Sequence, residues 1–213
     1  MQDTRRREIT ERQFESLIFI SSELVIFAMF YLMQVDAIFY YLYLSVTPLL
    51  FVVISYSLPE IRNAVSATLL SKDFMILISV LLFWLYLYAL TRNGPVYVFE
   101  TAYYPVFLEE FNFRFLIIMF LQRRFPIGQA IIIQAVLYSL LYLSFILFQG
   151  PGYPGIFAEL FMIDNFAMAV TYGAIYYFRK NFYIAAAVHM SLYLMDVFLP
   201  PSLGWIAYVT TPV

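Results

Sequence analysis

The residues of this sequence best suited to chemistry are two adjacent glutamates, an arginine and a histidine, all within long apolar runs. Glu109 and Glu110 are followed by Arg114, and His189 is the only histidine of the chain. A charged side chain in hydrocarbon costs roughly 2.5–3.5 kcal/mol even on the most favourable scale, so such residues usually face a bundle interior or a cavity. Their positions therefore require a structural or a functional explanation.

Helical spacing favours one ion pair among these charges and leaves one of the two glutamates without a charged partner. Glu110 and Arg114 are four residues apart and share a helix face, whereas Glu109 lies about 100° away around the helix. The unpaired carboxyl group is then desolvated, which suits general acid/base chemistry. The alternative is a structural ion pair that allows two charges to coexist in lipid. The sequence leaves both interpretations open.

Tyrosines on the following apolar runs extend this set. Tyr138 and Tyr142 are four residues apart, as are His189 and Tyr193, so each pair shares a helix face. Counted from the expected cytoplasmic ends, these pairs and the acids all fall about 10–22 Å deep, at about 1.5 Å per residue. We therefore expect them to share one slab of the bilayer, although tyrosine often only packs or lies at an interface. Three other polar residues lie within apolar runs: Asp164, Asn165 and Asp196. For these we favour helix–helix hydrogen bonding.

The elements that must position these residues are membrane-spanning helices. The chain is 63% hydrophobic and 12% charged, against roughly 45–50% and about 25% in soluble domains. A helix needs about 20 apolar residues to cross the hydrocarbon. We therefore expect an all-α polytopic transmembrane bundle of about seven spans. The corresponding apolar runs are 16–34, 37–57, 74–91, 97–121, 127–148, 156–178 and 182–199.

Basic residues predict a cytoplasmic N-terminus for this bundle. With that orientation ten Lys and Arg side chains lie in cytoplasmic segments, Arg92 alone lies outside, and Arg114 is within a span, as the positive-inside rule requires. We expect a multi-pass protein of the cell membrane. Its parts are a cytoplasmic basic segment at 1–15, one transmembrane domain at 16–199 and a short extracytoplasmic tail at 200–213. Cytoplasmic loops are expected near 58–73, 122–126 and 179–181.

Composition disfavours several classes of site. The chain has no cysteine, which excludes disulfides and Cys-ligated zinc or iron–sulfur sites, and a single histidine is far from the multi-histidine pattern of zinc centres. We therefore expect no cofactor and no metal. Nothing is basic enough for nucleic acid outside short membrane flanks. The expected partners are the lipid bilayer and a membrane-bound polypeptide, as substrate or as binding partner.

The stretch from Glu109 to Arg114 resembles the first motif of the CPBP family of membrane endopeptidases, which includes the CAAX prenyl endopeptidases and the bacteriocin-immunity (Abi) proteins. The family motif EExxxR is matched in all three fixed positions. By spacing, the second motif, FxxxH, falls on Tyr138 to Tyr142, and the third, HxxxN, falls on His189 to Tyr193. The resemblance covers a CPBP-like core at about 97–199.

The resemblance implies that a first-motif glutamate and the second-motif histidine activate water, while the third-motif His and Asn stabilise the oxyanion. This sequence has Tyr142 in place of that histidine and Tyr193 in place of that asparagine. A tyrosine hydroxyl can donate to an oxyanion, and Glu109 with His189 would form a reduced acid/base pair. A hydroxyl that ionises only near about pH 10 is nevertheless a poor substitute for an imidazole base.

Two functional hypotheses follow for the candidate site. We favour a CPBP-like pseudoprotease with lost or reduced peptidase activity that binds a membrane partner or serves as a complex subunit. The alternative is an active glutamate-dependent intramembrane endopeptidase that cleaves a membrane-bound polypeptide. A transporter is least favoured, because the sequence lacks two halves with matching broken helices. The candidate site residues are Glu109, Glu110, Tyr142, His189 and Tyr193, with Arg114 as a structural partner.

Overall fold

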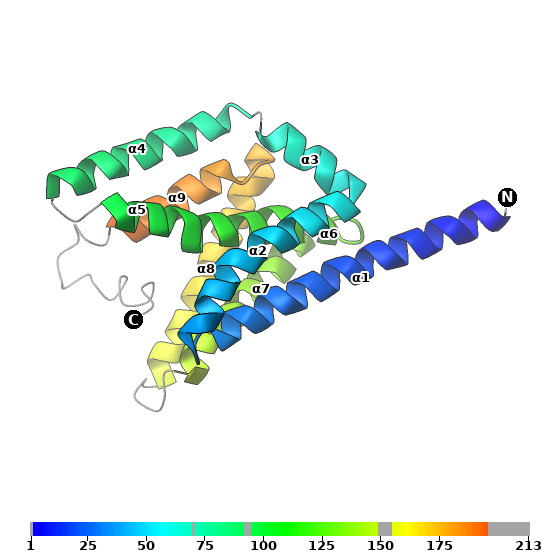
Figure 1. Ribbon diagram of the computed structural model, residues 1–213, viewed down its shortest axis with the longest axis horizontal. Helices are drawn as coiled ribbons and strands as arrows, with labels where there is room; N and C mark the ends of the chain where they lie inside the picture. Colours follow the sequence, from blue (N-terminus) through cyan, green and yellow to red (C-terminus); the bar gives the residue numbers. More distant parts are fainter. Residues whose placement is uncertain (1, 70, 92–94, 149–154, 196–213) are drawn as a thin grey trace. The chain divides into compact units, whose positions relative to one another are not determined.

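The computed structural model describes residues 2–69, 71–91, 95–148 and 155–195, and every regular element in these ranges is a helix (Figure 1). This confirms the expected all-α class for the described part of the chain. The elements are α1 (Gln2–Leu32), α2 (Ala37–Ser57), α3 (Pro59–Leu69), α4 (Asp73–Thr91), α5 (Pro95–Thr101), the π-helical η1 (Ala102–Phe107) and η2 (Glu110–Ile117), α6 (Ile118–Leu121), α7 (Ile127–Phe148), α8 (Gly155–Arg179) and α9 (Tyr183–Met195).

Four of the described helices are long and apolar enough to cross a membrane, and α9 is a shorter apolar helix. Their exposed side chains are largely apolar, among them Leu24, Tyr56 and Leu82, as expected for helices that face lipid. The count of seven spans and the orientation of the N-terminus stay predictions. The four spans are Thr10–Leu32, Ala37–Ser57, Asp73–Leu90 and Ile127–Phe148.

Two segments expected outside the spans are helical. α1 begins at Gln2, so the basic segment expected at 1–15 continues directly into the first span, because its Arg, Glu and Gln residues are good helix formers. α3 lies inside the loop expected near 58–73. It begins at Pro59, which tolerates the first helical position, and Glu60 in its first turn suits the helix dipole.

The chain divides into two compact units, of which the second holds the candidate site. The first comprises the described residues of Met1–Ala67 and Leu143–Gly152, and the second those of Thr68–Tyr142 and Tyr153–Val213. In the first unit α1 packs against α2. In the second unit α9 packs against α4, α8, η1 and η2, and α4 and α9 run side by side (Figure 1). α9 is therefore the helix around which the site is assembled.

The span expected at 97–121 is interrupted before the two glutamates. Tyr104 has an extended conformation (φ −132°, ψ 130°) and is followed by Pro105, with a cis peptide bond between them. Proline has no N–H and breaks an α-helix. A π-helical segment then runs from Glu110 to Ile117, and all eight of its residues are buried. π-helical segments are frequent at functional sites, and this one carries Glu110 and Arg114.

Candidate functional site

The structure brings together all six candidate residues in the second unit. Glu109, Glu110 and Arg114 lie at or within η2 and are fully buried, with 0% of each exposed. Tyr142 lies on α7, and His189 and Tyr193 lie on α9. Three helical segments therefore meet around two carboxylates that have no contact with solvent.

Glu109 is held by two tyrosines of α7. The Tyr138 hydroxyl donates to Oε2 at 2.8 Å, and the Tyr142 hydroxyl donates to Oε1 at 2.6 Å. On α9, the ring of Tyr193 contacts that of His189, with centroids 5.2 Å apart. Because Tyr138 and Tyr142 are one helical turn apart, their hydroxyls reach the same carboxylate, one to each oxygen. The two bonds direct the Glu109 carboxylate toward α7.

Glu110 lies between Arg114 and His189. Arg114 Nε is 3.3 Å from Oε2 of Glu110, so the expected ion pair is present. His189 Nδ1 is 2.8 Å from Oε1 of Glu110. His189 thus contacts Glu110, and the acid/base pairing of His189 with Glu109 stays a prediction. Of the two adjacent glutamates, Glu110 is the one that contacts α9, through His189.

Aromatic rings surround the Arg114 guanidinium, and the two nearest are those of Tyr138 and Tyr172. Its Cζ is 4.3 Å from the ring centroid of Tyr138 and 5.1 Å from that of Tyr172. Such cation–π contacts contribute about 2 kcal/mol or more when desolvated. Tyr172 also stacks on His189, with ring centroids 5.0 Å apart. The sequence analysis missed Tyr172, because nothing in its spacing separates it from the other tyrosines among the 19 in the chain.

The segment that carries this site also matches a known family. The family model of the type II CAAX prenyl endopeptidases, Rce1-like, matches residues 91–195. This segment belongs to the CPBP family. Together with the apolar helices, this match identifies an integral membrane protein. Comparisons with curated proteins and with solved structures gave no significant match.

The matched segment of this CPBP protein contains all six candidate residues. Its tyrosines alter the second motif at both fixed positions: Tyr138 occupies the Phe position of FxxxH, and Tyr142 occupies the His position. Each change introduces a phenolic hydroxyl, and these are the two hydroxyls that bind Glu109. The two residues that depart from the family motif are therefore the same two residues that hydrogen-bond to Glu109.

Several polar atoms of the site are buried without a hydrogen-bond partner in the described part of the chain. They include His189 Nε2, both terminal nitrogens of Arg114 and the amide of Gln134, which lies one turn before Tyr138. Leaving such a group unsatisfied costs about 1–3 kcal/mol. These atoms are among the groups of the site that remain able to bind another polar group.

Within the described part of the chain, Asp164 and Asn165 do not make the interhelical hydrogen bonds expected of them. Asp164 is exposed, and the Asn165 amide nitrogen donates to the Phe161 carbonyl of its own helix at 2.8 Å. The interhelical bond expected for this amide is therefore replaced by one within α8. Asp196 lies outside the described residues. Within the described ranges, no group of three His, Asp or Glu side chains is placed to hold a metal ion.

Proposed function

We propose that this CPBP protein binds a membrane partner and has lost, or nearly lost, the peptidase activity of its family. The observation that carries the proposal is the hydrogen bonding of Glu109, whose two oxygens each accept a tyrosine hydroxyl, at 2.8 Å from Tyr138 and 2.6 Å from Tyr142. A general base acts on a water within about 2.6–3.2 Å. Here the hydroxyls of Tyr138 and Tyr142 occupy the place of such a water and bind the Glu109 carboxylate themselves.

The arrangement of Glu110 supports the same proposal. Its two oxygens face Arg114 and His189, and all three side chains are at most 1% exposed. A buried charge needs a partner that compensates its desolvation, and this cluster supplies one on each side. The second first-motif glutamate is thereby engaged in holding η2 against α9.

We further propose a seven-span protein of the cell membrane with a cytoplasmic N-terminus and a membrane-bound polypeptide as its partner. The distribution of Lys and Arg supports this orientation. A parallel arrangement of α4 and α9 supports it as well, since Phe74 contacts Tyr183 near the starts of the two helices and Tyr88 binds Leu194 near their ends. In the proposed topology these helices are the third and seventh spans and run in the same direction.

An active glutamate-dependent endopeptidase is the second candidate function, and one observation favours it. His189 Nε2 and the terminal nitrogens of Arg114 are buried and unpaired within the described chain. Donors of this kind stabilise an oxyanion when they point at the position it occupies. The EExxxR motif is also complete.

Cleavage assays on the full-length protein in lipid nanodiscs test the proposal. Prenylated and transmembrane test peptides are incubated with the unmodified protein and with its Glu109→Ala/Glu110→Ala and His189→Ala variants. An active CPBP endopeptidase in the same nanodiscs serves as positive control. We expect equal background cleavage by all three forms. Cleavage by the unmodified protein that both variants abolish would establish the endopeptidase instead.

A further inference from the structure

One face of α4 is buried although α4 carries none of the candidate site residues. Asp73, Trp84 and Tyr88 are 8%, 5% and 0% exposed. Asp73 and Trp84 are about three helical turns apart, and Trp84 and Tyr88 about one turn, so the three side chains share a face. Tyr86, on the opposite face, is 64% exposed. α4 also precedes nearly all of the family-matched segment, which begins at residue 91.

At the start of α4, Asp73 binds the connection between α8 and α9. Its carboxylate accepts hydrogen bonds from Arg179 Nε and Nη2 and from Asn181 Nδ2. Asn181 Oδ1 accepts in turn from the backbone N–H of Tyr183 at 3.2 Å. Lys180, which lies between Arg179 and Asn181, has a left-handed conformation (φ 58°) that reverses the chain. Asp73 is thereby connected to the first residue of α9.

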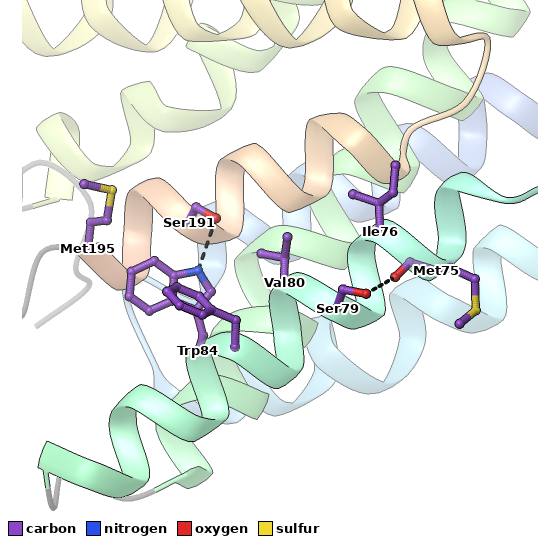
Figure 2. A pocket seen from close by; sticks show the side chains of 8 residues that line it. Met75, Ile76, Ser79, Val80, Trp84, Ser191 and Met195 are labelled. Atoms are coloured by element: carbon purple, nitrogen blue, oxygen red, sulfur yellow. Dashed lines mark hydrogen bonds between the residues drawn. The ribbon is translucent and has the colours of Figure 1, made fainter.

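Further along, two aromatic side chains of α4 bind α9 itself. Trp84 Nε1 donates to Ser191 Oγ at 3.1 Å, as Figure 2 shows. The Tyr88 hydroxyl donates to the Leu194 carbonyl at 3.2 Å. Trp84 and Ser191 also line a groove between the two helices (Figure 2). Polar contacts therefore join α4 to the connection that precedes α9, to the middle of α9 and to its end.

These contacts lie on the side of α9 away from the site. Ser191 follows His189 by two positions, about 200° around the helix. His189 accordingly faces Glu110 while Ser191 faces α4. Lipid is as apolar as the helix surfaces, so packing and interhelical hydrogen bonds set how membrane helices align. A small shift of α9 along its axis would lengthen the 2.8 Å contact of His189 with Glu110 beyond hydrogen-bonding distance.

We propose that α4 is the positioning element of the site: Asp73, Trp84 and Tyr88 fix α9 from behind so that His189 meets Glu110. The three are positioning residues, since they act through α9 and touch no candidate site residue in these contacts. The inference deepens the proposed function and rests on it, because it concerns the same His189–Glu110 pair.

The single histidine allows a direct test by NMR. Full-length protein labelled with ¹³C/¹⁵N-histidine, in nanodiscs and free of any histidine tag, gives ring signals from His189 alone. A Glu110→Gln variant shows where these signals move when the contact is altered. We expect Asp73→Asn, Trp84→Phe and Tyr88→Phe each to shift the signals in the same direction.

Matched controls separate positioning from general destabilisation. Tyr86→Phe makes the same change as Tyr88→Phe on the exposed face of α4, and Lys72→Gln neutralises an exposed charge beside Asp73. Both should leave the His189 signals in place. Tyr88→Phe removes one oxygen atom and keeps the ring, so it remains decisive if Asp73→Asn does not fold.

Two different results would separate this inference from the proposed function. If Tyr88→Phe and Trp84→Phe lower the unfolding midpoint while the His189 signals stay at their original positions, α4 only stabilises the protein and the positioning inference is wrong. Glutamate-dependent cleavage by the unmodified protein would instead reject the loss of activity. It would leave the positioning result intact.

Discussion

Tyr142 donates a hydrogen bond of 2.6 Å to Oε1 of Glu109, and both side chains are buried. The tyrosine stands at the histidine position of the second motif, and the family resemblance implies that this histidine works with a first-motif glutamate on a water molecule. Replacing the imidazole by a phenol converts a base into a donor to the glutamate. The substitution thus accounts for a stable buried acid and for the proposed loss of activity.

The Tyr142 hydroxyl should contribute measurably to stability. Tyr142→Phe keeps the ring and removes one of the two hydrogen bonds to Glu109, and a bond to a charged group contributes about 1.5–3 kcal/mol. We expect the free energy of unfolding to fall by about that amount in detergent micelles. The control is Tyr86→Phe at an exposed position, where a change within about 0.5 kcal/mol is expected. Equal effects of the two substitutions would contradict this account of Glu109.

Removal of Arg114 should destabilise the protein more than removal of the Glu110 charge. Arg114→Leu leaves two buried carboxylates near one histidine, and breaking a buried ion pair in this way costs about 3–5 kcal/mol. Glu110→Gln is less damaging because Arg114 keeps its contacts with the rings of Tyr138 and Tyr172. Unfolding titrations of both variants measure the order. A yield and midpoint for Glu110→Gln as low as for Arg114→Leu would show that the pairing scheme is incorrect.

The double variant Arg114→Leu/Glu110→Gln tests the same pair without leaving a lone charge. For contacting residues the combined loss differs from the sum of the single losses by about 0.5–3 kcal/mol. We expect the double variant to be less destabilised than the sum. Simple additivity would mean that the 3.3 Å contact carries no interaction energy.

Spacing within a helix predicted much of the site because it fixes rotation about one axis. The pairing of Glu110 with Arg114 follows from their separation of four residues, and the structure contains it. The spacing of residues along one helix does not predict which neighbouring helix packs against each of its faces. For that reason the contact of His189 with Glu110 was not predicted, and Tyr172, which stacks on His189, was not found.

The helix break before the site had a signal in the sequence that the apolar run obscured. Pro105 lies inside the expected span 97–121, and a proline in a helix interior removes a backbone hydrogen bond and clashes with the preceding turn. Hydropathy averaged over the run registers only that the segment is apolar. α3 was missed for the opposite reason, since a short helix of low hydropathy does not stand out from a loop.

Close packing of α7 and α8 at Gly173 gives a prediction with a built-in control. A Cβ at Gly173 would lie 2.8 Å from Ile131 Cγ2, whereas at Gly128 nothing lies within 4 Å. Gly173→Ala should therefore lower the free energy of unfolding by about 1–3 kcal/mol. Gly128→Ala should leave it unchanged or raise it by about 0.4–1 kcal/mol. Ile131→Ala combined with Gly173→Ala should be less damaging than the two single losses added together.

The proposed topology can be tested on residues of the described turns because the chain has no cysteine. Val35, between α1 and α2, is 63% exposed, and Gln122, after α6, is exposed as well. With a cytoplasmic N-terminus, Val35→Cys should react with a membrane-impermeant maleimide on intact cells, and Gln122→Cys should react only after the membrane is opened. The reverse pattern would overturn the orientation.

Restoring the family's second and third motifs should release the glutamate and create activity. Tyr142→His supplies an imidazole and removes the bond to Oε1 of Glu109, and Tyr193→Asn restores the oxyanion residue. Tyr138 still binds Oε2 at 2.8 Å, so this double variant retains one of the two constraints. Tyr138→Phe removes it and returns the motif to FxxxH. We therefore expect cleavage of test peptides by the triple variant to exceed that by the double variant.

The size of this gain is limited by packing. General-base assistance contributes typically 10²–10⁴-fold, but a base misplaced by about 1 Å loses much of its effect, and the neighbouring side chains are packed around phenol rings. We expect the triple variant to cleave at the low end of that range above background, and its activity to disappear when Glu109→Ala is added. If the triple variant folds and its activity is no greater than that of the Glu109→Ala form, the tyrosines are not what silences the site. Cleavage by the triple variant that persists without Glu109 would remove this glutamate from the mechanism.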